Sequence, residues 1–307
     1  MINLNRFDLV TLRLFVAVVD AGSLTSGADR FGISLAAASK RIAELEQHCG
    51  VVLLQRSQRG VTTTAGGQTL HRHAIEVIAK LEQLAQAVDE LESGASGHLR
   101  LNANPSAFGG FLPGLLAAYA LRFPSVRIDL EDALSEDGVR AVQKGTAELA
   151  VIGDNVPHEG LETFVCNVDE LVLVVPRGHA LAGRGRVPVR DALVHELIAL
   201  ARTASLTRQV ISAAEAVGLT VRIRVQVRSF DSMCRMVARG LGLAVLPHAP
   251  ADLFAQALDL AIVRLEGAEV ERRLLLAMRS RAQLSPAALA LVEMVEDLTA
   301  QGGVIAA

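Results

Sequence analysis

The stretch Arg30–Gly50, RFGISLAAASKRIAELEQHCG, decides the fold of the first part of the chain. Its apolar residues recur at helical spacing, at Ala38, Ile42 and Leu45. Ser34 is placed to cap the start of this helix, and Gly50 follows its last apolar residue. The first turn, 35–37, is small and apolar, whereas an ordinary surface helix carries Glu and Lys there. Such a tip suits close approach to another surface.

Two helical patterns precede this stretch, and two extended segments follow it. An apolar stripe over 9–19 predicts a first helix that ends near Gly22, and Ser23 can cap a second helix over 24–31. A short helix, a turn containing Gly32 and a capped helix form the helix-turn-helix pattern. Segments 51–54 and 61–63, with basic residues between them, predict a two-stranded wing with a basic tip.

The charge of the chain is unevenly distributed around a net value of −3. Between Arg30 and Arg72 the sequence has six Lys and Arg residues and only two Glu, which predicts a confined surface for a polyanion. A recognition helix must enter a major groove ~12 Å wide, so a smooth first turn predicts contact with base edges of double-stranded DNA. We expect DNA contacts from Ser23, Ser34, Leu35, Ala36, Ser39, Lys40, Arg41, Arg56, Arg59 and Thr64.

The next helical pattern has a regular heptad spacing of apolar residues. The spacing alternates strictly between four and three from Leu70 to Leu91 and is typical of a coiled coil. The alternative is an amphipathic helix lying on its own domain, which Ile75 and Ile78 would support. We expect the pairing of two chains through Leu70, Val77, Leu81, Leu84, Val88 and Leu91. Residues 93–97, SGASG, predict a hinge.

From residue 98 onward, strand and helix patterns alternate, which predicts βαβ units on a largely parallel sheet. More than 200 residues of this pattern favour two lobes. Ligands in such sheets lie at the carboxyl ends of strands, against helix N-termini that favour anions. The candidate ligand-binding residues at these places are Asn104, Ser106, Ser135, Thr203, Ser205, Phe230 and Asp231. For each Ser or Thr, ordinary helix capping is the alternative role.

The first part of the chain resembles the winged helix-turn-helix of the LysR-type transcriptional regulators. The matching landmarks are the AGS turn at 21–23, Ala28, Ser34, Ser39, Ile42, Leu45-Glu46, Gly50, Leu53-Leu54, Arg56 and Thr64-x-Gly66. The family's usual Ser-Gln-Pro at the recognition helix is Ser34-Leu35-Ala36 here, so its base preferences do not carry over to those two positions.

The resemblance implies a multidomain α/β protein. A winged helix-turn-helix domain (1–64) and a long linker helix (65–92) would lead through the hinge (93–97) to two Rossmann-like lobes of periplasmic-binding-protein type. The first lobe would comprise 98–164 and 268–307, and the second 165–267. The resemblance also implies a bacterial homodimer or homotetramer, a small carboxylate or similar effector between the lobes, and RNA polymerase as a further partner.

Other classes of protein fit the sequence less well. The three cysteines are widely spaced, the histidines are scattered, and no nucleophile elbow, phosphate loop or metal motif is present, so we expect no enzyme, cofactor or metal. An enzyme with an accessory helix-turn-helix stays an alternative. A solute-binding protein would need an export signal, and the apolar run 14–19 is too short for one. We expect a cytoplasmic protein.

Overall fold

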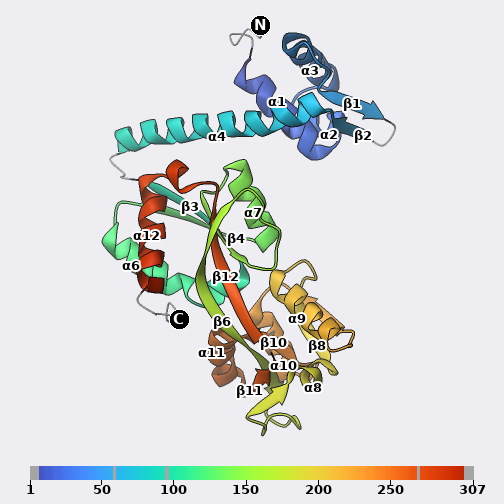
Figure 1. The fold of residues 1–307 in the computed structure, drawn as a ribbon, viewed down its shortest axis with the longest axis vertical. Helices are drawn as coiled ribbons and strands as arrows, with labels where there is room; N and C mark the ends of the chain where they lie inside the picture. The colour runs from blue at the N-terminus through green and yellow to red at the C-terminus, as the bar shows by residue number, and fades with distance from the viewer. Residues whose placement is uncertain (1–6, 58–59, 94–96, 268–269, 301–307) are drawn as a thin grey trace. The chain divides into compact units, whose positions relative to one another are not determined.

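The computed structural model describes residues 7–57, 60–93, 97–267 and 270–300, and the chain separates into two compact units, Met1–Gly94 and Ala95–Ala307 (Figure 1). Among the described residues, no helix is long and apolar enough to cross a membrane. Each unit has a hydrophobic core of its own.

The first unit is a winged helix-turn-helix followed by one long helix. Its elements are α1 (Leu9–Ala21), α2 (Leu24–Phe31), α3 (Leu35–Cys49), β1 (Leu54–Ser57), β2 (Gly60–Thr63) and α4 (Ala65–Ser93). Side chains from α1, α2 and α3 enclose its core, in which Phe15, Ala38 and Ile42 are fully buried. The apolar positions of the opening stretch therefore pack inward, as their spacing predicts.

Polar caps fix the helix boundaries of this unit. The Ser23 hydroxyl accepts a hydrogen bond from the Ser26 N–H (3.3 Å), and the Ser34 hydroxyl accepts one from Ala37 (3.2 Å). Gly32 ends α2 with a φ of 73°, a left-handed conformation that suits glycine. The caps confirm the start and end predicted for α2.

The first wing strand starts later than the sequence predicts. Segment 51–54 was expected to be extended, but β1 begins at Leu54 because Glu46 Oε1 accepts hydrogen bonds from the N–H groups of Leu53 (2.8 Å) and Leu54 (3.1 Å). The preceding residues thus form a turn tied to α3. As a result, Arg56 lies within β1, opposite Val61, rather than at the wing tip.

The second unit has two α/β lobes. The elements of the first lobe are β3 (His98–Ala103), α5 (Pro105–Gly109), α6 (Leu112–Arg122), β4 (Arg127–Asp132), α7 (Ser135–Lys144), β5 (Leu149–Gly153), β12 (Glu271–Met278), a 3-10 turn (Arg281–Gln283) and α12 (Pro286–Ala300). Those of the second are β7 (Arg186–Pro188), α8 (Val189–Leu193), β8 (Glu196–Leu200), α9 (Ser205–Ala216), β9 (Arg222–Val227), α10 (Phe230–Ala238), β10 (Ala244–Pro247), α11 (His248–Leu258) and β11 (Leu260–Glu266).

In the first lobe, helices cover both faces of the sheet β4-β3-β5-β12. Alternate residues of β5 separate the two faces: Leu149 packs under α6 and α12, whereas Ile152 packs under α7 (Figure 1). The strand β5 is therefore buried on both sides, which explains its continuous apolar run.

One strand, β6 (Glu162–Pro176), belongs to both lobes. Its first part pairs with β12, and its last residues pair with β10 and β11 in the second lobe (Figure 1). These pairings are antiparallel, as is that of β12 with β5, so the sheet is mixed. The expectation of a largely parallel sheet was wrong because the chain crosses between the lobes along β6 and returns along β12.

Candidate functional site

The exposed tip of α3 is the candidate DNA-contacting surface. Leu35 keeps 48% of its surface exposed, although it is a large apolar residue, and Ala36 is exposed beside it. One turn further, the Lys40 side chain is also exposed and lies 3.9 Å from Glu44. Ser39 is half-buried. This surface combines an apolar tip with a cation, which suits a DNA groove.

Other predicted DNA contacts have structural roles within the unit. The hydroxyls of Ser23 and Ser34 cap helices, and the Thr64 hydroxyl accepts from Gly67 N–H (3.0 Å) while it donates to the Val52 carbonyl (2.7 Å). Arg41 donates to Thr11 Oγ1 (3.0 Å), which ties α3 to α1. Arg59 and the side chain of Arg56 lie outside the described residues.

The heptad positions of α4 divide into two groups. Leu70 packs against the core of the first unit. Val77, Leu81 and Leu84 keep 46%, 40% and 59% of their surfaces exposed within the single chain. The side chains of Val88 and Leu91 lie outside the described set. The exposed residues form an apolar stripe, which we call the α4 seam (Val77, Leu81 and Leu84).

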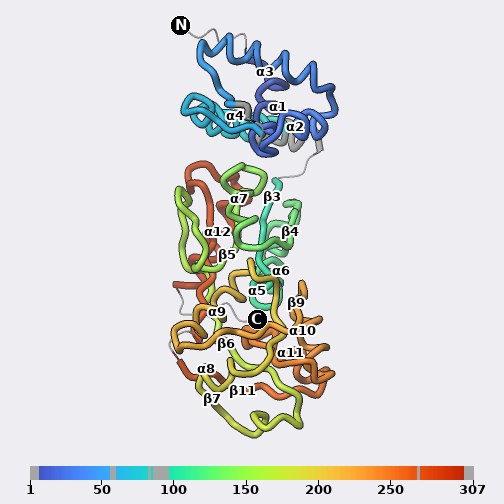
Figure 2. The backbone as a smooth tube through the Cα atoms, turned by 90° about the vertical axis from the view of Figure 1, so that its right-hand side faces the viewer, coloured from blue at the N-terminus to red at the C-terminus, as the bar shows by residue number. Residues whose placement is uncertain are grey.

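Four of the predicted effector-binding residues meet between the two lobes. The Ser135 hydroxyl, at the start of α7, accepts hydrogen bonds from Asn104 Nδ2 (3.2 Å) and Gly153 N–H (3.1 Å) and donates one to Ser205 Oγ (3.2 Å). Ser205 begins α9 in the second lobe. All four side chains, of Asn104, Ser106, Ser135 and Ser205, are buried. Figure 2 shows α5 and α9 at this junction.

The centre of this junction is a residue that the sequence analysis missed, Arg272 on β12. Only 1% of its surface is exposed. Its guanidinium donates hydrogen bonds to Ser106 Oγ (3.3 Å) in the first lobe and to Ser205 Oγ (2.7 Å) and Gln209 Oε1 (3.0 Å) in the second. Burial lowers the pKa of Arg272 to about 10, so the group stays charged at neutral pH. We call Ser106, Ser135, Ser205, Gln209 and Arg272 the interlobe cluster.

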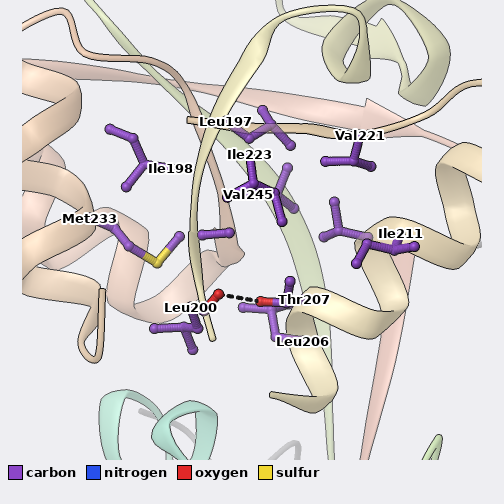
Figure 3. Close-up of a pocket in the computed structure, with 12 residues that line it drawn as sticks. Leu197, Ile198, Leu200, Leu206, Thr207, Ile211, Val221, Ile223, Met233 and Val245 are labelled. Carbon is purple, nitrogen blue, oxygen red and sulfur yellow. Dashed lines mark hydrogen bonds between the residues drawn. The ribbon is translucent and has the colours of Figure 1, made fainter. Parts of the chain in front are cut away.

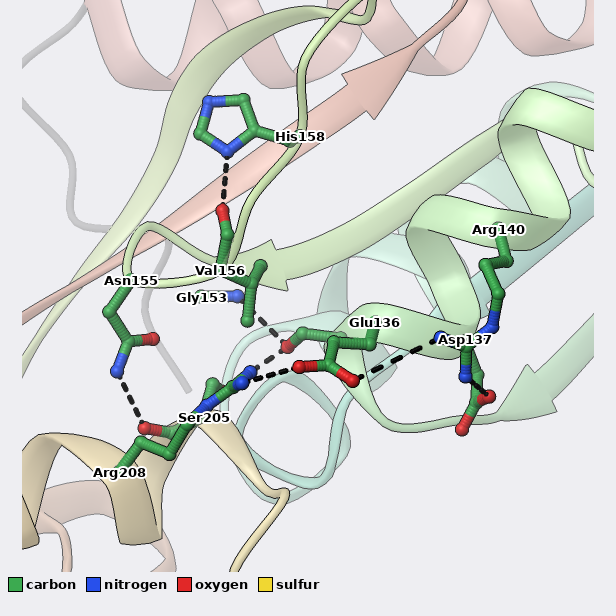
Figure 4. A network of polar contacts seen from close by, with 10 residues as sticks. Glu136, Asp137, Arg140, Gly153, Asn155, Val156, His158, Ser205 and Arg208 are labelled. Atoms are coloured by element: carbon green, nitrogen blue, oxygen red, sulfur yellow. Dashed lines mark hydrogen bonds and ion pairs between the residues drawn. The ribbon is translucent and has the colours of Figure 1, made fainter.

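Further polar contacts join the lobes around this cluster (Figure 4). Arg208 Nη1 on α9 pairs with Glu136 in the first turn of α7, and Asn155 Nδ2 donates to the Ser205 carbonyl (2.8 Å). Two other nitrogens of Arg208, Nε and Nη2, are buried without a hydrogen-bond partner in the described part of the chain. The junction therefore holds two guanidinium groups but one directly paired carboxylate.

The remaining predicted effector residues lie apart from the cluster. Thr203 is exposed in the loop before α9. The Asp231 carboxylate pairs with Arg235 (2.9 Å) on α10. Phe230 is buried in the second lobe and faces Gly109 of α5, where an added Cβ would lie 3.2 Å from its ring. Phe230 therefore contacts the other lobe without a polar role.

An apolar cavity of about 10 Å³ lies inside the second lobe, between β8, α9 and α10 (Figure 3). Its lining is aliphatic apart from Thr207, whose hydroxyl donates to the Leu200 carbonyl (3.2 Å), and Met233. Such a volume holds about one water molecule at most, so it is a packing gap rather than a ligand site. The described residues contain no group of three or more His, Cys, Asp or Glu side chains that could hold a metal ion.

Comparisons with known proteins match both units. Residues 9–68 match the model of the bacterial regulatory helix-turn-helix protein, lysR family, and residues 92–300 match that of the LysR substrate binding domain. An uncharacterized HTH-type transcriptional regulator, YfeR of Shigella flexneri, is 29% identical, with 95% of this chain and 94% of that protein covered.

Solved structures share the fold. Full-length OxyR from Pseudomonas aeruginosa superposes with a TM-score of 0.63 at 19% identity, over 98% of this chain and 96% of that one. Full-length CbnR in complex with its target DNA gives 0.54 at 23% identity, over 95% and 99%. These relatives are transcriptional regulators rather than enzymes, and the matches span nearly the whole length of both chains. The chain therefore belongs to the LysR family of bacterial transcriptional regulators.

Proposed function

We propose that this protein is a ligand-responsive regulator that binds operator DNA in the bacterial cytoplasm, and that a small anionic effector bound between its lobes alters that binding. The observation that carries the proposal is the interlobe cluster, in which buried hydroxyls from both lobes meet a buried cation. A ligand held there contacts both lobes, so it shifts their equilibrium by the difference in its affinity for the open and closed states.

DNA binding through the tip of α3 is the second part of the proposal. Leu35 and Ala36 are exposed on the first turn of α3, and Lys40 is exposed one turn further along, as in a recognition helix. The basic residues between positions 30 and 72 neutralise phosphates, so the affinity for DNA should fall steeply with salt.

The α4 seam supports a homodimer, and two such dimers would form the tetramer that the family resemblance implies. Three apolar side chains at heptad spacing stay exposed within the single chain, and pairing with a second copy would bury them. Paired recognition helices read DNA half-sites at fixed helical intervals, so a lobe movement transmitted to the pair changes which half-sites are bound together. RNA polymerase is the partner through which such a change would alter transcription.

Selection from a pool of random DNA duplexes, followed by mobility-shift assays on the enriched sequence, tests this function. We expect a selected sequence that the protein binds at low salt and releases as the salt concentration rises. Lys40→Ala should weaken binding and change base preference, whereas Lys144→Ala, on α7 of the second unit, should do neither. Failure of the wild type to enrich any sequence would overturn the proposed function.

A further inference from the structure

Helix α1 contacts both helices that the proposed function uses, α3 with the candidate DNA-contacting tip and α4 with the seam. Near the start of α1, Arg41 of α3 donates a hydrogen bond to Thr11 Oγ1 (3.0 Å), which in turn donates one to Asp8 Oδ2 (2.7 Å). Near the end of α1, the Nε2 atom of His71 on α4 lies 3.2 Å from Asp20 Oδ1. The two contacts are ~14 Å apart along the helix axis. Helix α1 therefore holds α3 at one end and α4 at the other.

The contact between His71 and Asp20 is polar and partly shielded from water. An ionised carboxylate only accepts hydrogen bonds, so the imidazole Nε2 is the donor. The His71 and Asp20 side chains keep 22% and 25% of their surfaces exposed. The His71 ring also meets the fully buried ring of Phe15 edge to face, with the centroids 6.4 Å apart and an interplanar angle of 69°. Both interactions depend on direction, whereas the apolar contacts of the neighbouring Leu70 with the core do not.

The start of α4 is the pivot of a long lever. An added Cβ on Gly67 would collide with the Leu53 carbonyl oxygen, so the first turn of α4 lies directly against the chain that leads from α3 to the wing. From Gly67 to Leu84, at the far end of the seam, the helix extends ~26 Å. A tilt of ~10° at the pivot would move the end of the seam by ~4 Å, close to the ~3.4 Å rise of one base pair. A small change in the angle of α4 therefore corresponds to a change of about one base pair between paired half-sites.

We propose that the contact between His71 and Asp20 determines which separation of DNA half-sites the protein binds, because it fixes the angle between α1 and α4. This inference rests on the proposed function and deepens it, since it names the residues that position the paired recognition helices. His71 is a positioning residue that acts through α1, to which Arg41 ties the recognition helix. With the contact made, one angle of α4 is favoured, and with it one half-site separation. Without the contact, the remaining apolar contacts of α4 allow a range of angles.

Two rival roles for His71 predict different results. If His71 only stabilises the first unit, its replacement lowers the unfolding temperature and leaves the relative affinities for different half-site separations unchanged. If His71 binds a DNA phosphate, its replacement weakens binding at every separation alike and makes the affinity less dependent on salt. Only a positioning role changes the ratio of affinities between one separation and another.

The test uses the full-length protein and a series of duplexes built on the DNA sequence that the wild type enriches. Each duplex contains the same two half-sites, at the enriched separation or at one that is longer or shorter by up to three base pairs. Mobility-shift titrations give the affinity for each duplex. His71→Phe keeps a ring beside Phe15 but removes the N–H donor, and His71→Gln restores a donor close to the position of Nε2. His73→Phe is the matched control, because His73 lies on the same helix, is exposed, and pairs with Glu76 of α4 itself (3.1 Å).

We expect the wild type and His73→Phe to bind the enriched separation at least about tenfold more tightly than separations one base pair longer or shorter. His71→Phe should bind these three separations within about threefold of one another, because the loss of one hydrogen bond to a charged group removes a preference of that size. His71→Gln should regain most of the preference of the wild type.

A wild-type ratio of affinities in His71→Phe would overturn the inference, whether its affinities fall equally at all separations or not at all. Equal binding of all separations by the wild type would contradict it as well. If His71→Phe does not fold, Asp20→Ala decides by the same criterion, since it removes the acceptor and also a carboxylate near the C-terminus of α1, where the helix dipole disfavours negative charge. The wild type enriches DNA whatever these ratios are, so failure of this inference is distinct from failure of the proposed function.

Discussion

The Oγ atoms of Ser135 and Ser205 lie 3.2 Å apart, although the two residues begin helices in different lobes of the second unit. Both hydroxyls are buried, and Ser205 also accepts a hydrogen bond from Arg272. The contact brings the positive ends of two helices together, which is unfavourable unless negative charge or acceptor oxygens lie between them. The close approach of the lobes thus depends on the polar groups of the interlobe cluster.

Gly153 permits this approach, and a methyl group there should disrupt it. A Cβ at Gly153 would lie 2.8 Å from Ser205 Oγ and 2.9 Å from Ser205 Cβ. We expect Gly153→Ala to lower the free energy of unfolding by about 1–3 kcal/mol through overpacking, measured by urea unfolding with circular dichroism. Gly178→Ala is the control, because nothing lies within 4 Å of its added Cβ. Equal stability of the two variants would mean that the lobes separate freely at this point.

The helix-turn-helix was predictable from sequence because local interactions define it. Ser34 caps α3 and Gly50 ends it, and the apolar face between them packs inward. The wing was predicted less well, because the turn before β1 depends on Glu46, whose carboxylate reaches seven residues along the chain to Leu53. Helix and strand propensities of single residues do not predict side-chain contacts of this kind.

The interlobe cluster was only half predictable for a similar reason. Ser106, Ser135 and Ser205 follow buried strands at helix starts, so their positions alone indicated a common edge. Arg272 is the second residue of β12 (Glu271–Met278), and a pair of adjacent arginines near a strand end is typical of an exposed surface. Only the tertiary fold places one of them, Arg272, against residues 63 to 166 positions earlier in the chain.

Asp169 should make stability depend on pH. It lies opposite Arg272 in the register of β6 and β12, and burial raises the pKa of its carboxyl to about 6 from 3.8. The folded state therefore binds a proton more tightly than the unfolded chain, so the free energy of unfolding falls as the pH rises from about 4 to about 6. Above that range the ionised carboxylate costs at most about 3 kcal/mol.

Asp169→Asn should remove this dependence. We expect the variant to unfold at a higher temperature than the wild type at neutral pH and at a similar temperature near pH ~4. Glu170→Gln, at the exposed neighbouring position, should keep the pH profile of the wild type. Thermal unfolding across this range of pH measures the effect, and an unchanged profile in Asp169→Asn would show that another group titrates.

The α4 seam should be the site of dimerisation. Replacing Leu81 and Leu84 together by Lys would place unpaired charges in a packed apolar contact, which costs several kcal/mol per ion. We expect the double variant to sediment as a smaller species and to lose its affinity for the selected DNA. Leu121→Lys, at an 86% exposed position on α6, should change neither. A double variant with the sedimentation coefficient of the wild type would rule out pairing through α4.

Leu35 should contribute to the choice of operator sequence. Its side chain is 48% exposed at the tip of α3 and can make only apolar contacts, for example with a thymine methyl group. A glutamine at this position can form two hydrogen bonds to adenine, and such a pair discriminates against the wrong base by about 1–3 kcal/mol. We therefore expect Leu35→Gln to select DNA that differs from the wild-type sequence at one position of each half-site, where adenine becomes preferred. Leu253→Gln, at an exposed position of α11, should select the wild-type sequence. If both variants enrich the same DNA as the wild type, the tip of α3 does not contact bases, and base recognition lies elsewhere on the first unit.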